Sequence, residues 1–181
     1  LHEIEAEVAR TRSLLRMTIV VRPENYYLER NIIEGITQVF EQHDTIIVLE
    51  DDIVTSPHFL QFMNDAFRVY RDDQRVMHVS GFTRLSTLSP PLGPTGRLTL
   101  QEPSTYFSPF MAGWGWGTWR DRWQKHFRHY QLRAEALAGL AQEDLNALEY
   151  GGVFPCLKHL DRQPIPWDIC WGIAIHRAQG L

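Results

Sequence analysis

The feature that most constrains this chain is a group of three consecutive acids that directly follows an apolar run. Residues 45–49 are Thr-Ile-Ile-Val-Leu, and Glu50, Asp51 and Asp52 come next. β-Branched and aliphatic residues bounded by polar ones are typical of a buried strand. Open α/β sheets bind ligands at the carboxyl ends of their strands, and adjacent carboxylates repel one another unless a cation or a ligand neutralises them. The pattern favours a divalent-metal site. The alternative is a solvated acidic turn that caps the next helix.

The metals that suit such a site are Mg²⁺ and Mn²⁺. These ions commonly take one or two carboxylates and fill their remaining positions with water and substrate phosphates. A nucleoside diphosphate fits this behaviour better than a cage made only of protein ligands. A bound cation would also neutralise the charge that develops on a diphosphate leaving group.

Composition and charge narrow the class of protein. The chain has 181 residues, 44% hydrophobic and 22% charged, which predicts one globular domain with a real core. Its net charge of −4 creates no positive electrostatic field that would attract nucleic acid. No apolar run approaches the roughly 20 residues that span a bilayer. Because the chain begins at Leu1 rather than Met, we expect it to be a piece of a larger protein.

Apolar periodicity predicts alternating helices and strands in the first half of the chain. This alternation indicates an α/β fold in which helices cover a parallel-dominated sheet. The segment that follows, 83–104, contains four prolines and no clear period, which predicts a long loop. The expected elements are helix 2–15, strand 17–21, helix 29–41, strand 45–49, a helix from Pro57 capped by Thr55 or Ser56, and strand 76–79.

The second half combines helices over 133–149 and 155–162 with a segment rich in glycine and tryptophan. Gly113, Trp114 and Gly115 place a wide aromatic face beside backbone that a ligand can approach closely. Sugars present apolar C–H faces that stack on such rings. For these residues, a role in ligand binding and a role in packing both stay open.

Two further tryptophans, Trp119 and Trp123, are four residues apart. This spacing favours the packed face of a helix that begins near Thr118 over a role in ligand binding. The histidines show no spacing typical of a metal motif, so each is interpreted as a surface or hydrogen-bonded residue.

A single acid, Asp168, lies between Trp167 and Trp171. An acid in aromatic surroundings is costly to bury unless it is hydrogen-bonded or used in chemistry. Such surroundings raise the pKa of a carboxyl group, which suits a general base that acts on a sugar hydroxyl. The alternative is a helix N-cap at the start of a helix over 169–178, and the two roles are compatible.

Taken in order, these motifs resemble a known family. The order is strand, Glu-Asp-Asp, a Ser-Pro-x-Phe helix, Ser80-Gly81, a Gly-Trp segment and a late Trp-Asp. The chain resembles the nucleotide-sugar-dependent glycosyltransferases of the GT-A fold. More narrowly, it is similar to bacterial sugar transferases of the glycosyltransferase family 2 type and to the Golgi N-acetylglucosaminyltransferase that starts hybrid and complex N-glycans. The resemblance extends from about residue 20 to 175 and is most specific at 48–52 and 113–116.

For the donor, the resemblance implies roles at the acidic group and near the second helix. Asp52 would coordinate Mn²⁺, or Mg²⁺, that bridges the donor diphosphate. Asp51 would face the ribose or the metal shell, and Glu50 the donor sugar. Asn31 falls where the relatives contact the nucleotide base, although a surface role is an open alternative.

For sugar and acceptor, the resemblance implies roles in the second half. Gly113, Trp114 and Gly115 would line the pocket for the donor sugar and the acceptor. Asp168 would deprotonate the acceptor hydroxyl, which gives inversion at the anomeric carbon in one displacement. Trp167, which adjoins this base, is counted with the substrate-binding residues.

The resemblance implies a GT-A (Rossmann-like) α/β fold, incomplete at both ends, in one partial catalytic domain. Residues 1–82 would form its nucleotide and metal half, and 83–181 its sugar and acceptor half. The implied function is metal-dependent, inverting transfer of a hexose or N-acetylhexosamine from a nucleotide-sugar donor to a glycan or lipid-linked acceptor. We expect a cytoplasmic location, free or peripheral to a membrane, or the Golgi lumen for a eukaryotic source.

The sequence departs from the family in three ways. Nothing before Leu1 supplies the first strand and helix that cradle the nucleotide in the relatives, and nothing after Leu181 supplies their final strands and closing loop. Tyr27 stands where the bacterial relatives commonly have glycine. Two other functions stay open: a carbohydrate-binding module without turnover, and a metal-dependent phosphoester hydrolase that uses the same acids.

Overall fold

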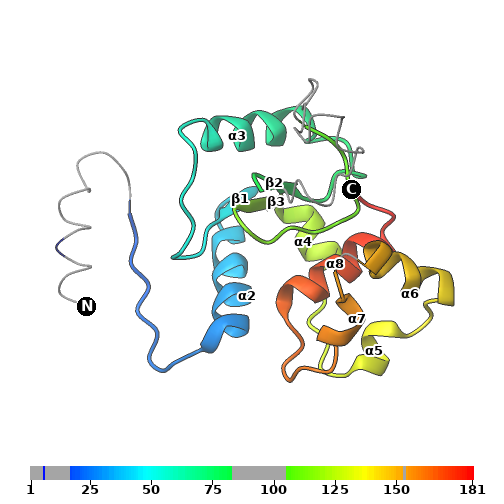
Figure 1. Ribbon diagram of the computed structural model, residues 1–181. Helices are drawn as coiled ribbons and strands as arrows, with labels where there is room; N and C mark the ends of the chain where they lie inside the picture. Colours follow the sequence, from blue (N-terminus) through cyan, green and yellow to red (C-terminus); the bar gives the residue numbers. More distant parts are fainter. Residues whose placement is uncertain (1–5, 7–16, 83–104, 153) are drawn as a thin grey trace, which may run out of the picture.

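A small antiparallel sheet lies at the centre of the computed structural model, which describes residues 6, 17–82, 105–152 and 154–181 (Figure 1). Its strands are β1 (Thr45–Val48), β2 (Val79–Ser80) and β3 (Trp116–Trp119). Their order is β1-β3-β2, and β3 pairs antiparallel with both neighbours. Ile47 and Val79 both lie opposite Gly117.

The predicted GT-A (Rossmann-like), parallel-dominated sheet is therefore wrong. β1 and β2 run in the same direction, and along the chain they come before and after α3 (Phe59–Val69), as the predicted alternation of strands and helices indicates. They do not pair, because β3 lies between them and takes the hydrogen bonds of both. β3 comes from the Gly-Trp segment, for which the sequence predicted a role in ligand binding or packing and no strand. The predicted strand at 17–21 is also wrong, since these residues form no strand.

One glycine makes this close pairing possible. A β-carbon on Gly117 would lie 2.4 Å from the carbonyl oxygen of Ile46 and 2.5 Å from the ring of Phe67. The central strand needs a residue without a side chain at this point, because the backbone of β1 and the side chains of α3 both approach it.

The two faces of the sheet pack against different helices, as the period of two in a strand requires. Val48 and Trp116 face a core shared with α2 (Tyr27–Phe40), α4 (Arg120–His126) and α8 (Trp167–Arg177). Ile47 and Trp119 face α3 on the opposite side (Figure 1). The predicted strand at 45–49 and the predicted helix at 29–41 are confirmed with small shifts in their ends.

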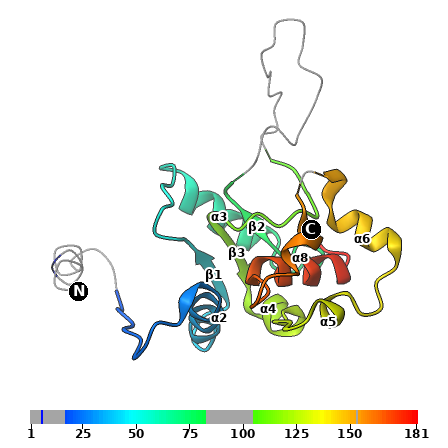
Figure 2. The same ribbon diagram turned by 60° about the horizontal axis from the view of Figure 1, so that its bottom comes forward.

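α8 is the most deeply buried helix of the part that the structure describes, with eight of its 11 residues buried. It lies between the sheet and a second core formed with α5 (Arg133–Leu137), α6 (Gln142–Leu148) and α7 (Cys156–His159) (Figure 2). A short 3₁₀ turn at Tyr150–Gly152 follows α6. A helix buried on all sides is apolar all round, and residues 169–175 of α8 match this expectation.

Several predicted helix ends differ from the observed ones. The helix expected at 133–149 is interrupted between α5 and α6, where Gly139 adopts a φ of 76°. α3 has His58 as its N-cap with no side-chain bond, so the predicted cap at Thr55 or Ser56 is wrong. The expected helix at 2–15 and loop at 83–104 lie outside the described residues.

Trp119 and Trp123 are both buried, as predicted, but the predicted common helix face is wrong, because Trp119 packs in the core with α3 and Trp123 packs in the core with α8. Their side chains are 3% and 4% exposed, respectively. Trp119 ends β3 and is the N-cap of α4, which begins at Arg120. None of the helices in the described part of the chain has both the length and the apolar character needed to cross a bilayer.

Substitution of Gly117 tests the close pairing of β3. We expect Gly117→Ala to lower the free energy of unfolding by about 1–3 kcal/mol or more, because the new methyl group meets backbone that cannot move aside. Gly35→Ala is the matched control, since a β-carbon there meets nothing within 4 Å inside α2. It should raise the free energy of unfolding by about 0.5–1 kcal/mol through helix propensity. Urea denaturation measures both, and equal effects of the two changes would contradict the packing described here.

Candidate functional site

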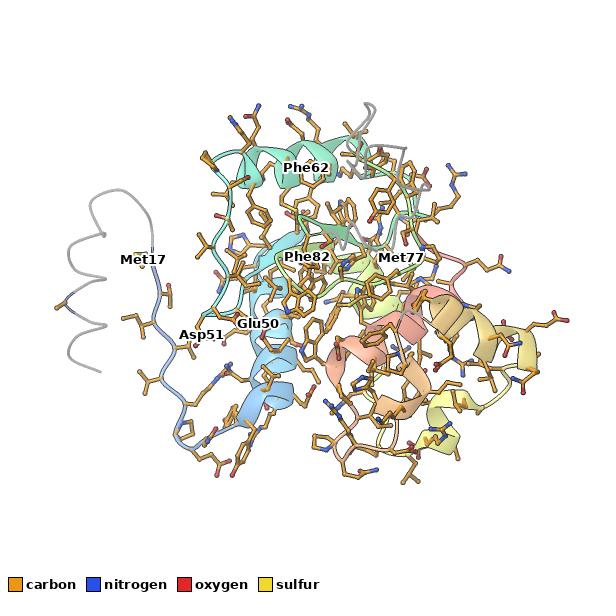
Figure 3. All side chains as sticks on the ribbon, viewed as in Figure 1. Met17, Glu50, Asp51, Phe62, Met77 and Phe82 are labelled. Carbon is orange, nitrogen blue, oxygen red and sulfur yellow. The ribbon has the colours of Figure 1, made fainter. Side chains whose placement is uncertain are left out.

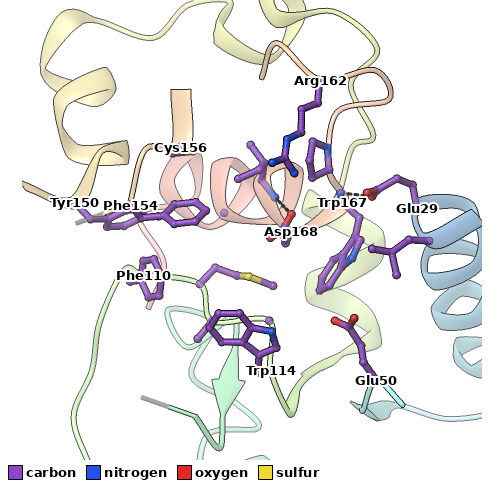
Figure 4. A pocket seen from close by; sticks show the side chains of 17 residues that line it. Glu29, Glu50, Phe110, Trp114, Tyr150, Phe154, Cys156, Arg162, Trp167 and Asp168 are labelled. Carbon is purple, nitrogen blue, oxygen red and sulfur yellow. Dashed lines mark hydrogen bonds between the residues drawn. The ribbon is translucent and has the colours of Figure 1, made fainter. Parts of the chain in front are cut away.

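A cavity of about 220 Å³ brings together residues from widely separated parts of the sequence (Figure 4). Glu29 comes from α2, Glu50 follows β1, Trp114 precedes β3, and Asp168 comes from α8. Of the residues that the sequence predicted for a site, the cavity is lined by Glu50, Gly113, Trp114, Trp167 and Asp168. Ligand pockets commonly have such an apolar wall with a few convergent polar groups.

The remaining predicted residues lie outside this cavity. Asp51 and Asp52 are exposed in the turn that follows β1, and Figure 3 shows Asp51 beside Glu50. Gly115 has a φ of 63°, and its carbonyl oxygen accepts the N–H of Gly81 at 2.8 Å. This glycine therefore shapes the backbone next to Trp114 and does not line the cavity.

Asn31 lies at a second, more open hollow near the start of α2. Its Oδ1 accepts a hydrogen bond from Nε of Arg22 at 3.3 Å. Tyr26 and Tyr27 line the same hollow, and Leu28 borders both this hollow and the cavity. The structure places Asn31 apart from the other predicted residues.

Asp168 lies in the first turn of α8 with its carboxyl group in the cavity wall. Its Oδ1 accepts the N–H of Ile169 at 2.9 Å. Burial raises the pKa of Asp168 above its ordinary value, while hydrogen bonds from the backbone N–H groups of Ile169 and Asp168, and then the charges of His159 and Arg162, oppose this rise. The predicted direction is confirmed. The predicted N-cap position is wrong, because Pro166 is the N-cap and Asp168 lies inside the helix.

Glu50 points into the same cavity from the end of β1 (Figure 4). Burial raises the pKa of Glu50, and the charges of Asp52, Asp168 and Asp51 raise it further. Glu50 is thus the member of the acidic group that turns inward, whereas its two neighbours face solvent. The local sequence pattern does not give the directions of the three side chains, because β1 ends before them and the turn decides how each one points.

Two further charged residues line the cavity and were missed by the sequence reasoning, Glu29 and Arg162. Glu29 accepts the backbone N–H of Trp167, and burial raises the pKa of its carboxyl group. Arg162 precedes α8 and brings a positive charge to a cavity whose other charged lining residues are acids. Glu29 resembles any acid in the first turn of a helix, so no local pattern distinguishes it.

The two tryptophans of the cavity differ in exposure. Trp167 is 3% exposed, and its ring stacks on Trp116 with centroids 5.1 Å apart and planes at 17°. Trp114 is 43% exposed, and its ring meets Phe82 edge to face at 4.8 Å. Trp114 is therefore the ring with surface for a ligand, and Trp167 is chiefly a rigid wall.

A half-buried histidine, His78, fixes the backbone next to Trp114. Nε2 of His78 donates to the carbonyl oxygen of Ala112 at 3.1 Å, and its Nδ1 accepts from Nε1 of Trp171 at 3.4 Å. The imidazole also stacks on Trp116 at 5.1 Å. Burial lowers the pKa of His78 to about 4. The ring is neutral at physiological pH, which its acceptor role toward Trp171 requires.

The acidic turn is compatible with a weakly held divalent cation. Within the described ranges, no group of three or more His, Cys, Asp or Glu side chains lies close enough together to hold a metal. Asp51 and Asp52 are exposed carboxylates in one turn. They fit an ion such as Mg²⁺ or Mn²⁺ that keeps water and takes its other ligands from a phosphate. They do not form a closed protein cage.

Comparisons of the chain with protein-family models, with curated proteins and with solved structures gave no match. Functional inference therefore depends on the residues and their geometry.

Replacement of the buried acid tests its electrostatic environment. We expect Asp168→Asn to raise the free energy of unfolding at pH 7, because the ionised carboxylate costs more in the cavity than in the unfolded chain. A raised pKa in the folded state means that wild type loses stability as the pH rises through that value. The advantage of the variant should thus shrink toward zero in acid.

Urea denaturation between about pH 3 and pH 8 measures this difference. Asp72→Asn, at an exposed turn, is the control and should stay within about 0.5 kcal/mol of wild type. If the difference in free energy of unfolding between Asp168→Asn and wild type does not grow with pH, the ionised carboxylate of Asp168 does not destabilise the folded protein.

His78 should make the free energy of unfolding depend on pH with a sign opposite to that expected from Asp168. The folded pKa of His78 is about 4, below its ordinary 6.5, so the unfolded chain binds the proton first as the pH falls. Wild type should lose on the order of 3 kcal/mol between about pH 6.5 and 4 from this group, at about 1.4 kcal/mol for each pKa unit. His78→Gln should lack this part of the slope, and His43→Gln at an exposed position should retain it. Identical slopes in wild type and His78→Gln would refute a lowered pKa of this ring.

Proposed function

We propose that the chain carries the catalytic site of a metal-dependent, inverting glycosyltransferase. The reaction would move a hexose or N-acetylhexosamine from a nucleotide-diphosphate sugar to a glycan or lipid-linked acceptor. The observation that carries the proposal is the shared cavity of Glu50, Trp114 and Asp168, from three distant segments. The family resemblance selects the same residues from motif order alone. The proposal depends on this site and not on a Rossmann-like sheet.

Asp168 is suited to the role of general base. Its carboxylate would accept the proton of the acceptor hydroxyl while the hydroxyl oxygen forms a bond to the anomeric carbon. The bond from that carbon to the diphosphate breaks on the opposite face, which inverts the configuration. A raised pKa makes the carboxylate a stronger base toward a hydroxyl. Arg162 keeps a positive charge near it.

The other residues of the site would hold the donor. Glu50 points into the cavity and would accept hydrogen bonds from sugar hydroxyls. Trp114 would stack on the apolar face of a sugar ring, for which its exposed ring has room. Asp52, with Asp51 beside it, would hold the cation, which when bound neutralises the diphosphate.

Transfer assays with a panel of nucleotide sugars and Mn²⁺ test the proposal. We expect Asp168→Asn to lower kcat by about 10²–10⁴-fold while donor affinity stays within about threefold, because a base acts mainly in the transition state. Asp52→Ala should weaken Mn²⁺-dependent donor binding by tenfold or more. Asp72→Ala is the matched control for an exposed aspartate in a turn and should resemble wild type.

Three results would refute the proposal. Full activity in both Asp168→Asn and Asp52→Ala would remove the assigned roles. Glycan binding through Trp114 with no turnover of any donor would favour a carbohydrate-binding module. Hydrolysis of phosphoesters without sugar transfer would favour the hydrolase.

A further inference from the structure

A single hydrogen bond connects α2 to the helix that carries the proposed base. The carboxylate of Glu29 accepts the backbone N–H of Trp167, 138 residues later in the chain (Figure 4). Trp167 is the first residue of α8, and the N-cap, Pro166, provides no side-chain hydrogen bond. The cap of α8 therefore comes from another helix.

The hydrogen bond from Trp167 to Glu29 is made at the first turn of α8, which sets the position of the Asp168 carboxylate. The first N–H groups of a helix have no partner within it, and a carboxylate there also interacts favourably with the helix dipole. Trp167 and Asp168 are the first two residues of α8. A change in the position of that turn would move the carboxylate of Asp168 relative to Glu50 across the cavity.

α2 is a rigid support for Glu29. Ile36 and Phe40, from the same helix, are 2% and 1% exposed and pack in the core that includes Trp167 and Trp171. Arg30, the next residue, forms ion pairs with surface acids and does not bind Glu29. The carboxylate of Glu29 is therefore carried by a firmly packed helix and accepts one hydrogen bond from the backbone, that of Trp167.

The arrangement has an electrostatic cost. The carboxyl group of Glu29 faces Asp168 on α8, Glu50 after β1 and His129 after α4, and Asp168 in turn faces His159 and Arg162. Burial raises the pKa of Glu29, and the charge of Asp168 raises it further. A neutral side chain would avoid this repulsion, so a cap chosen for stability alone does not explain an acid here.

We propose that Glu29 is a positioning residue that fixes the first turn of α8, and so holds Trp167 and Asp168 in their places in the cavity wall. Its importance for transfer rests on the proposed function. Its charge has a second effect, because two nearby carboxylates each make the other harder to ionise. The charge of Asp168 raises the pKa of Glu29, and because this repulsion is mutual, an ionised Glu29 disfavours ionisation of Asp168.

Amide hydrogen exchange tests the positioning without any substrate. We expect Glu29→Ala to raise the exchange rate of the Trp167 amide by about tenfold or more, because a hydrogen bond to a charged group is lost. Glu29→Gln keeps an oxygen that can accept this bond and should stay close to wild type. The amide of Cys170, which donates to Pro166 at 3.1 Å, should change less if the loss is local.

Glu34→Ala is the matched control, since Glu34 lies on the same helix and forms only a surface pair with Arg30. An unchanged Trp167 amide in Glu29→Ala, or an equal increase in Glu34→Ala, would overturn the proposal.

Titration of the Asp168 carboxyl carbon by NMR tests the effect of charge. In Glu29→Gln the midpoint for Asp168 should move to lower pH, because the neighbouring negative charge is gone while the hydrogen bond remains. Glu34→Gln should leave the midpoint in place. A cap with a purely structural role would leave it unchanged in both variants, and that result would overturn the electrostatic part of the proposal.

Activity separates this inference from the proposed function. If wild type transfers sugar and Glu29→Ala retains full kcat, Glu29 does not position the base, although the transferase assignment stands. If wild type transfers no sugar but the Trp167 amide and the Asp168 titration respond as expected, the positioning holds and the transferase assignment fails. For a positioning residue in an active transferase, kcat should fall by tenfold or more with little change in KM.

Discussion

The insertion of β3 between β1 and β2 is the interaction on which the rest of the structure depends. It joins the two halves of the chain in one sheet. It also places Trp116 opposite Val48, where the ring stacks on both His78 and Trp167. Gly117 allows this approach because no side chain stands between the strands. The Gly-Trp segment before β3 and the start of α8 thereby meet at one cavity.

The cavity gathers three carboxyl groups whose pKa values are all raised, those of Glu29, Glu50 and Asp168. A fold selected for stability alone would avoid this repulsion, and acids with raised pKa values in a cleft are typical of functional sites. Backbone N–H groups and Arg162 offset part of the cost. The neutral ring of His78 and the stacked Trp167 hold the walls in place. Rigid walls around costly charges are what a site for proton transfer requires.

Local sequence patterns predicted much of the secondary structure and part of the site. Helical spacing located α2 and α3, and an apolar run located β1. Motif order selected Glu50, Trp114 and Asp168, which do line one cavity. The parallel sheet was predicted wrongly because a period identifies strands but not which strands pair. Glu29 was missed because its partner, the N–H of Trp167, lies 138 residues away.

The sequence by itself located α2, α3 and the buried strand β1, since their apolar patterns depend on neighbours along the chain. It also proposed Glu50, Trp114 and Asp168 as residues of a site. Only the tertiary structure decided that β3 separates β1 from β2, that Glu50 turns inward while Asp51 and Asp52 face solvent, and that α2 caps α8. These outcomes depend on backbone pairing and on burial between distant segments. Of the three adjacent acids, Glu50 therefore lines the cavity while Asp51 and Asp52 lie on the surface. This difference cannot be read from their order in the sequence.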